Sequence, residues 1–169
     1  MDTGTRAALL ARYKMGYQEV ATTVQGLSDA ELDARPPAGD GWTPRQIVHH
    51  LADSEMTSAL RLRRLLAEEQ PVLASYDEEA FARRLYYDRP IAASLDALRA
   101  ARATSAEILE RLSEAEWGRA GTHEESGRYT VETWLEIYAA HSHDHAAQIR
   151  AALAGRAPVS FAEPLGEEP

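Results

Sequence analysis

Four long segments of this chain carry apolar residues at helical spacing, and glycine and proline gather between them. Residues three and four positions apart lie on one face of a helix, so each segment is predicted to bury one side. Alanine and leucine are abundant whereas phenylalanine occurs only twice, a composition that favours helices over sheet. The pattern predicts an all-α four-helix bundle whose helices span about residues 5–26, 44–68, 91–112 and 129–153.

Capping signals mark where two of the predicted helices begin. Thr43 suits the N-cap of the second long helix, with Pro44 at its first position and Gln46 two residues later. Ser28 and Glu31 have the spacing of a capping box for a short helix. These signals place loops between the long helices.

One stretch recurs in type along the chain. "LSDAELDAR" at 27–35 resembles "LSEAEWGRA" at 112–120, and an aromatic-threonine pair that opens a long helix follows each. The recurrence indicates either a repeat of two similar helical hairpins or two good capping boxes, which recur by their own physics. The sequence leaves both interpretations open.

The connection between the second and third long helices, about residues 69–90, is longer than adjacent antiparallel helices need. One short helix is predicted in it, near "DEEAFARRL". The length favours a bundle with a long crossover over a simple up-down-up-down order. We expect a single four-helix-bundle domain over residues 1–155 and an irregular acidic tail over 156–169.

Charge and cysteine content exclude several classes of function. The net charge of -9 disfavours nucleic-acid binding, because an acidic surface repels phosphates. The chain has no cysteine, which excludes disulfides, thiolate metal sites and a cysteine nucleophile. It also has no apolar signal-peptide core and no apolar run of membrane-spanning length. We therefore expect a cytoplasmic protein with no membrane partner.

The stretch "AAHSHDHAAQI" places His141, His143 and His145 in one predicted helix. Each residue of a helix turns the side chain by about 100°, so His141 and His145 lie about 40° apart. Both continue the apolar stripe of this helix, whereas His143 points to the polar side, about 160–200° away. The spacing therefore groups His141 with His145 and leaves out His143.

A third histidine faces the same core from the second long helix. In "VHHLAD", His50 falls on the side of the apolar residues and His49 points about 100° away. Three buried imidazoles in one core need partners for their nitrogens, and a divalent metal supplies one for each. A single buried histidine is more often a packed, hydrogen-bonded residue than a metal ligand. Three that face one core favour a metal site at His50, His141 and His145.

Three histidines leave coordination positions open for water or substrate, which is typical of catalytic zinc sites, since structural sites are closed by four ligands. Nickel, iron or cobalt would also accept imidazole and water, and we expect one divalent ion, zinc first and nickel next. The remaining candidates, His49, His123 and His143, are predicted to be solvated surface residues.

Two further residues are candidates for a catalytic role. Asp53 lies nearly one turn after His50, where it would orient a ligand histidine or take a proton, unless it is an exposed helix carboxylate. Arg61 lies about 20° from His50 three turns on, where it would hold a substrate carboxylate, unless it is a surface arginine with a packed stem.

Several of these motifs resemble one known family. "GWTPRQIVHHLADSEM" and "YAAHSHDHAAQI" are similar to the DinB-like superfamily, and most similar to its YfiT-like branch of metal-dependent hydrolases. The likeness extends over nearly the whole chain. It implies a four-helix bundle of unusual order with a long crossover, and a metal held by His50, His141 and His145.

The resemblance also bears on the reaction. Members related to this branch act as S-transferases that use bacillithiol or a similar low-molecular-weight thiol. The family name refers to DNA-damage induction and does not imply DNA binding. This chain departs from the family pattern at Glu55 and Thr57, where a histidine and an asparagine are expected, so its substrate preference differs if these positions line the pocket.

The sequence thus predicts a metal-dependent enzyme acting on a small molecule, either a hydrolase or a thiol S-transferase. A non-enzymatic metal or small-molecule binding module is the second class, and a helical interaction protein with an incidental histidine cluster is the third. The family likeness, with the aromatics of "YYDRP" and Trp117 near loops, predicts a homodimer.

Overall fold

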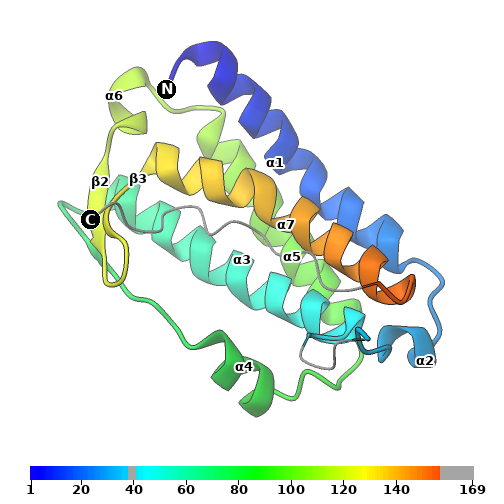
Figure 1. Ribbon diagram of the computed structural model, residues 1–169. Coiled ribbons are helices and arrows are strands. Elements are labelled where there is room, and N and C mark those ends of the chain that lie inside the picture. The colour runs from blue at the N-terminus through cyan, green and yellow to red at the C-terminus, as the bar shows by residue number, and fades with distance from the viewer. Residues whose placement is uncertain (38–40, 157–169) are drawn as a thin grey trace.

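The structure is a computed structural model, and it describes residues 1–37 and 41–156 (Figure 1). Four long helices dominate it: α1 (Thr3–Val24), α3 (Pro44–Ala67), α5 (Ala92–Leu109) and α7 (Val131–Leu153). Each lies within three residues of its predicted bounds, so the four-helix prediction is confirmed. Apart from Arg156, the predicted tail lies outside the described residues. None of the helices in residues 1–37 and 41–156 has the length and apolar character needed to span a membrane.

Side chains cap three of the long helices as their sequences require. Asp2 accepts a hydrogen bond from the Thr5 amide at the start of α1, and Thr130 accepts one from the Thr133 amide at the start of α7. At α3 the Thr43 side chain and Gln46 form a complete capping box ahead of Pro44. Each cap satisfies a backbone donor that the helix itself leaves unpaired.

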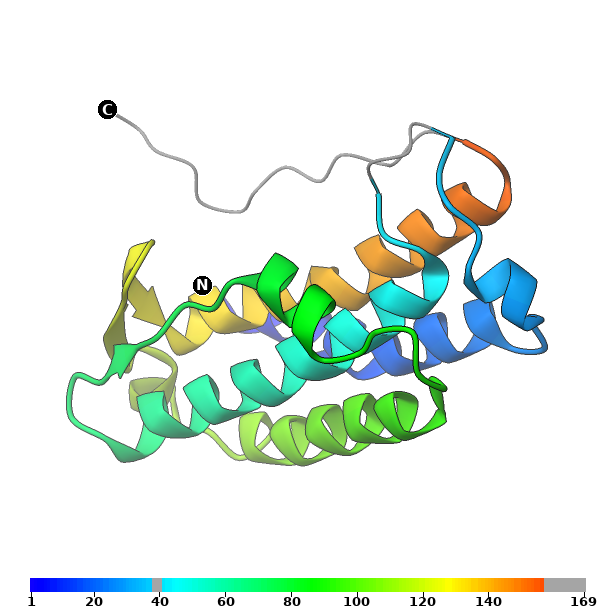
Figure 2. The same cartoon turned by 90° about the horizontal axis from the view of Figure 1, so that it is seen from below.

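The long helices form a ring in which α1 packs on α7 and α5, and α3 packs on α5 and α7. Followed by colour in Figures 1 and 2, α1 and α7 run in one direction while α3 and α5 run in the other. Because α3 and α5 are parallel neighbours, the chain must return along the bundle between Ala67 and Ala92. That return is the predicted long crossover, and it carries the short helix α4 (Glu78–Arg84), which packs on α3.

The two recurring stretches form one-turn helices, α2 (Asp29–Leu32) and α6 (Glu114–Trp117), each with a capping box. The hairpins that a repeat would imply are not pairs of closely packed neighbours. The main partners of α1 are α7 and α5, and α3 likewise packs mainly on α5 and α7. Each one-turn helix nevertheless connects two long antiparallel helices, so the structure is compatible with both a repeat and two capping boxes that recur for local reasons.

A small sheet, which the sequence did not predict, closes one end of the bundle (Figure 1). It has the order β1 (Val72–Leu73), β2 (Ala120–His123) and β3 (Gly127–Thr130), with β1 parallel and β3 antiparallel to β2. A Cβ atom on Gly121 would collide with the Pro71 carbonyl oxygen, so only glycine permits this approach. Strands of two to four residues are too short to show an alternating pattern.

The apolar core divides into two clusters along the bundle. Tyr13, Leu62 and Trp134 belong to the cluster near the sheet, and Val20, Leu51 and Ile149 to the one near α2. The side of α3 predicted to face inward is buried along its length, at Ile47, His50, Leu51, Ser54, Ser58 and Leu62. The helical period therefore predicted the inner face of α3 correctly.

A buried ionic network links all four long helices. The Arg102 guanidinium of α5 pairs with the Glu55 carboxylate of α3 at 2.6 Å and donates to the Ser142 hydroxyl of α7 at 2.9 Å. Tyr13 of α1 donates its hydroxyl to the same carboxylate, and its ring lies under Arg102. A Cβ atom on Gly16 would lie 2.6 Å from the Arg102 guanidinium, so this glycine makes room for the network.

Candidate metal centre

The three predicted metal ligands meet between α3 and α7. His50 projects from α3, and His141 and His145 project from neighbouring turns of α7. One ligand atom from each lies within 4.8 Å of the other two. The Nε2 atom of His141 is 3.3 Å from that of His50 and 3.2 Å from that of His145. The antiparallel packing of two distant helices thus brings together side chains 91 residues apart.

The two short distances at His141 fit a shared divalent ion. A tetrahedral ion with metal–nitrogen bonds of about 2.0–2.1 Å places two ligand nitrogens about 3.3 Å apart. The two Nε2–Nε2 distances at His141 have this length. Ring nitrogens this close otherwise compete for a single proton, whereas an ion accepts a lone pair from each of them. The donor set is therefore suited to zinc or another metal that accepts imidazole.

The surroundings keep the three imidazoles in the form that binds metal. Burial lowers the pKa of His50 and His141 well below the usual histidine range, and the adjacent His145 lowers both further. Burial also lowers the pKa of His145, although its hydrogen bond to Gln148 opposes that change. Metal ligation requires the neutral ring, so these shifts reduce competition from protons.

Outer contacts orient two of the ligands. The Nδ1 atom of His145 is 2.7 Å from the Gln148 amide oxygen, which can only accept, so Nδ1 carries the proton and Nε2 keeps its lone pair. A Glu78 carboxylate oxygen of α4 lies 3.9 Å from Nδ1 of His50. The Trp42 ring packs against the His50 ring at 4.6 Å between centroids and donates its N–H to Glu79. Helix α4 therefore supports the centre from outside the four-helix ring.

The other histidines lie apart from this cluster, but two of the three predictions about them are wrong. His143 turns toward α1, where its Nε2 atom lies 2.9 Å from the Arg12 carbonyl oxygen. His49 is fully buried and not solvated, because the first turn of α5 and the segment before it cover it: its nitrogens contact the Ser94 hydroxyl and the Arg89 carbonyl. His123 is also buried, in β2, a strand that the sequence did not reveal.

A cavity of about 310 Å³ opens beside the histidines. One of its walls is a face of α7 and the other comes from α3 and the crossover. The crossover residues Tyr76 and Glu78 were missed by sequence reasoning, because no local pattern reveals which helices a crossover will cover. The lining residues are Ser54, Arg61, Tyr76, Glu78, Glu136, Ile137, Tyr138, Ala140, His141, Asp144 and His145.

The two catalytic candidates differ in their relation to this cavity. Arg61 lines it, and its guanidinium lies between the Tyr138 hydroxyl and the Ala74 carbonyl. Asp53 is half-buried outside the lining, and it accepts a hydrogen bond of 2.7 Å from the Tyr87 hydroxyl. The geometry thus favours Arg61 over Asp53 for contact with a substrate.

The two departures from the family pattern, Glu55 and Thr57, do not line the cavity either. Glu55 faces the interior of the bundle, where it pairs with Arg102. Thr57 donates its hydroxyl to the Asp53 carbonyl of its own helix. Glu55 therefore bears on the packing of the bundle more directly than on substrate choice.

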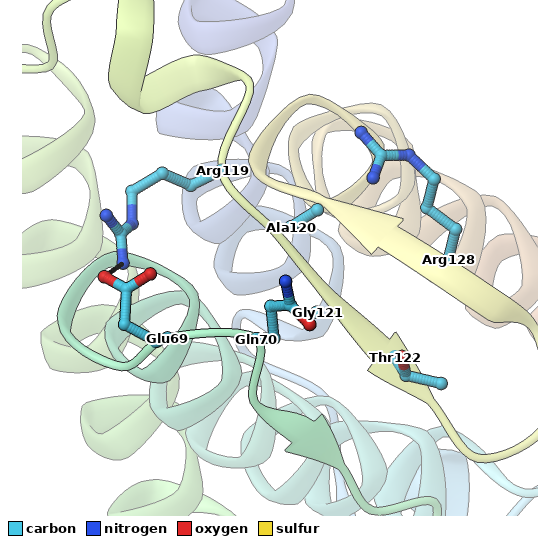
Figure 3. Close-up of a pocket in the computed structure, with 7 residues that line it drawn as sticks. All are labelled: Glu69, Gln70, Arg119, Ala120, Gly121, Thr122 and Arg128. Carbon is cyan, nitrogen blue, oxygen red and sulfur yellow. Dashed lines mark hydrogen bonds and ion pairs between the residues drawn. The ribbon is translucent and has the colours of Figure 1, made fainter.

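A larger hollow, of about 490 Å³, lies beside the small sheet. Figure 3 shows the ion pair between Arg119 and Glu69 on one side of it, and Arg128 on the other, across Gln70 and Gly121. Its lining contains no histidine, and Arg119 is held by Glu69 and backbone carbonyls. The cavity beside the histidines is therefore the better candidate for chemistry.

Comparisons with known proteins agree with the fold and identify a family. A protein of Oceanobacillus iheyensis, named as a candidate metal-dependent hydrolase, is 39% identical over 127 residues, which is 75% of this chain and 73% of that protein. YfiT of Bacillus subtilis, named in the same way, is 36% identical over 130 residues, 75% of this chain and 71% of YfiT.

The solved structure of Bacillus subtilis YfiT, described as having an unusual four-helix bundle topology, matches with a TM-score of 0.84. The match covers 90% of this chain and 87% of YfiT at 29% identity. The model of the DinB superfamily matches residues 12–149, which include all three clustered histidines. This chain therefore belongs to the DinB superfamily.

Proposed function

We propose that this protein is a divalent-metal-dependent hydrolase of a small molecule. The observation that carries the proposal is the convergence of three imidazole nitrogens beside a cavity of about 310 Å³. Three protein ligands leave room for water or substrate, as in catalytic zinc sites. The names of the relatives as candidate metal-dependent hydrolases support the same reaction class.

In this proposal the chain's residues have distinct tasks. His50, His141 and His145 hold the ion, for which zinc is the first choice and nickel the second. When bound, the ion supplies Lewis acidity and makes water a nucleophile near neutral pH. Gln148 holds the His145 ring in its ligating orientation, and the Trp42 ring shields the His50 ring. The cavity beside them has the volume of a small-molecule site.

The test combines metal analysis with turnover. Protein purified without a histidine tag is expected to contain about one divalent ion per chain. It is expected to hydrolyse members of a panel of small esters and amides, to lose this activity after chelation, and to regain it on reloading. Turnover that requires an added low-molecular-weight thiol and an electrophile would identify an S-transferase instead. A bound metal with no turnover in either assay would indicate a binding module.

We also propose that the protein is a homodimer, as the family likeness suggests. Two of the aromatic residues that first motivated this proposal are buried within one chain, Trp117 at 5% exposure and Tyr87 at 3%. Tyr86 remains 76% exposed, next to the 42% exposed Leu85. Light scattering after size-exclusion chromatography is expected to give twice the chain mass. A species of 18.6 kDa at micromolar concentration would contradict the proposal.

A further inference from the structure

We propose that the substrate of this centre carries a carboxylate, which is held by an anion subsite formed by Arg61, Tyr76 and Tyr138. The inference rests on the proposed function, because it assigns the substrate class of the same cavity. All three side chains line that cavity together with His141 and His145. The Tyr138 ring lies 5.8 Å from the His141 ring, so the subsite is adjacent to the ligands.

Arg61 is a half-buried guanidinium without a carboxylate partner. Among the ion pairs of residues 1–37 and 41–156, each fully buried arginine has an acidic partner, and Arg61 takes part in none. Its Nη atoms reach only the Ala74 carbonyl and, at 3.5 Å, the Tyr138 hydroxyl. Its Nε atom is buried and has no hydrogen-bond partner in the described part of the chain. A planar guanidinium in this state is suited to a bidentate anion.

Two tyrosine hydroxyls complete the subsite. The Tyr76 hydroxyl is buried and makes no hydrogen bond of normal length and angle within residues 1–37 and 41–156, although the Ser54 side chain is close enough to lower its pKa. Burial raises the pKa of Tyr76 and of Tyr138, so both hydroxyls stay protonated and can donate. Buried polar groups are rarely left unpaired, and the two residues that carry these atoms, Arg61 and Tyr76, line the same cavity. An acceptor supplied by a ligand would satisfy both.

The charges of the lining favour a carboxylate over a phosphate. Three acidic side chains, Glu78, Glu136 and Asp144, also line the cavity. A single negative charge on the substrate is balanced by Arg61. A doubly charged phosphate would leave an excess charge facing these carboxylates at short range, which is unfavourable in a partly buried cavity. At the subsite itself, the single positive charge of Arg61 is matched by a monocarboxylate end group.

The test uses small hydroxamates, whose hydroxamate group binds the metal, on zinc-loaded protein by isothermal titration calorimetry. Succinic and glutaric monohydroxamates, each with a free carboxylate, are compared with their neutral terminal amides. Of the two carboxylate-bearing hydroxamates, the one that binds the native protein more tightly is expected to bind about tenfold to a hundredfold more tightly than its own amide. This ratio is the one expected for a charge-assisted hydrogen bond. That ratio is expected to fall to about one in Arg61→Gln and to an intermediate value in Tyr76→Phe.

Arg63→Gln is the matched control, because Arg63 is a half-buried arginine of the same helix that does not line the cavity. It is expected to keep the native ratio. Equal affinity of acid and amide for the native protein would overturn the subsite without any variant. If the succinic, glutaric and acetyl hydroxamates all fail to bind the zinc-loaded protein, the metal has no open coordination position. That result would contradict the proposed function and not the subsite.

Discussion

Replacing any one of His50, His141 and His145 with alanine is expected to abolish high-affinity metal binding. The Nε2 atoms of these residues converge, and two imidazoles hold a divalent ion far less well than three. Zinc binding by four ligands provides roughly 10–16 kcal/mol, so one ligand contributes on the order of 3–4 kcal/mol, or about 10²–10³-fold in affinity. Competition with a coloured chelator measures this loss directly.

His143→Ala provides the matched control for these three variants. His143 lies on the same helix between two of the ligands, but its ring contacts the Arg12 carbonyl of α1. We expect this variant to bind one ion per chain with native affinity. If His143→Ala lost its metal while His141→Ala kept it, the proposed donor set would be wrong.

Breaking the buried pair of Glu55 and Arg102 is expected to be the most destabilising change in the bundle. Glu55→Ala would leave the Arg102 guanidinium buried at 2% exposure with no counter-charge, and Arg102→Ala would do the same to Glu55. Burial raises the pKa of Glu55, whereas Arg102 and the Tyr13 hydroxyl favour its charged form. Removing one partner of such a pair costs about 3–5 kcal/mol of unfolding free energy, which urea titration of the metal-free protein measures.

An exposed pair provides the comparison. Arg64 of α3 and Glu68, the C-cap residue of that helix, are paired at 2.8 Å, but both side chains are substantially exposed. Glu68→Ala is therefore expected to change the unfolding free energy by less than about 1 kcal/mol. A double replacement of Glu55 and Arg102 by apolar residues of similar volume should recover much of the lost unfolding free energy, because neither charge is then buried without a partner. A single Glu55→Ala variant with native stability would contradict the role assigned to the network.

The sequence predicted most of the bundle because long helices carry repeated local signals. The period of three and four residues, the Thr43 capping box and the length of residues 69–90 led to the observed helices and crossover. The same period grouped His141 with His145 and separated His143, and the packing of α3 on α7 completes the cluster with His50.

What the sequence could not predict depends on contacts between distant segments. His49 looked like a surface residue on a helical wheel, but Ser94 and Arg89 from the next segment bury it. Glu55 looked like a change in a binding pocket, yet its partner Arg102 lies 47 residues away. No local sequence pattern predicts either contact, because each depends on how whole helices pack.

The parallel placement of α1 beside α7 has a consequence for how the chain acquires its structure during synthesis. A major packing partner of the first helix is the last one, more than 100 residues later in the sequence. Contacts of such high sequence separation slow folding, because a long loop must close before they form. The ribosome must release α7 before α1 gains this partner and before the three histidines can meet. Until then the apolar faces of α1 and α3 stay partly uncovered, which makes the nascent chain prone to aggregation.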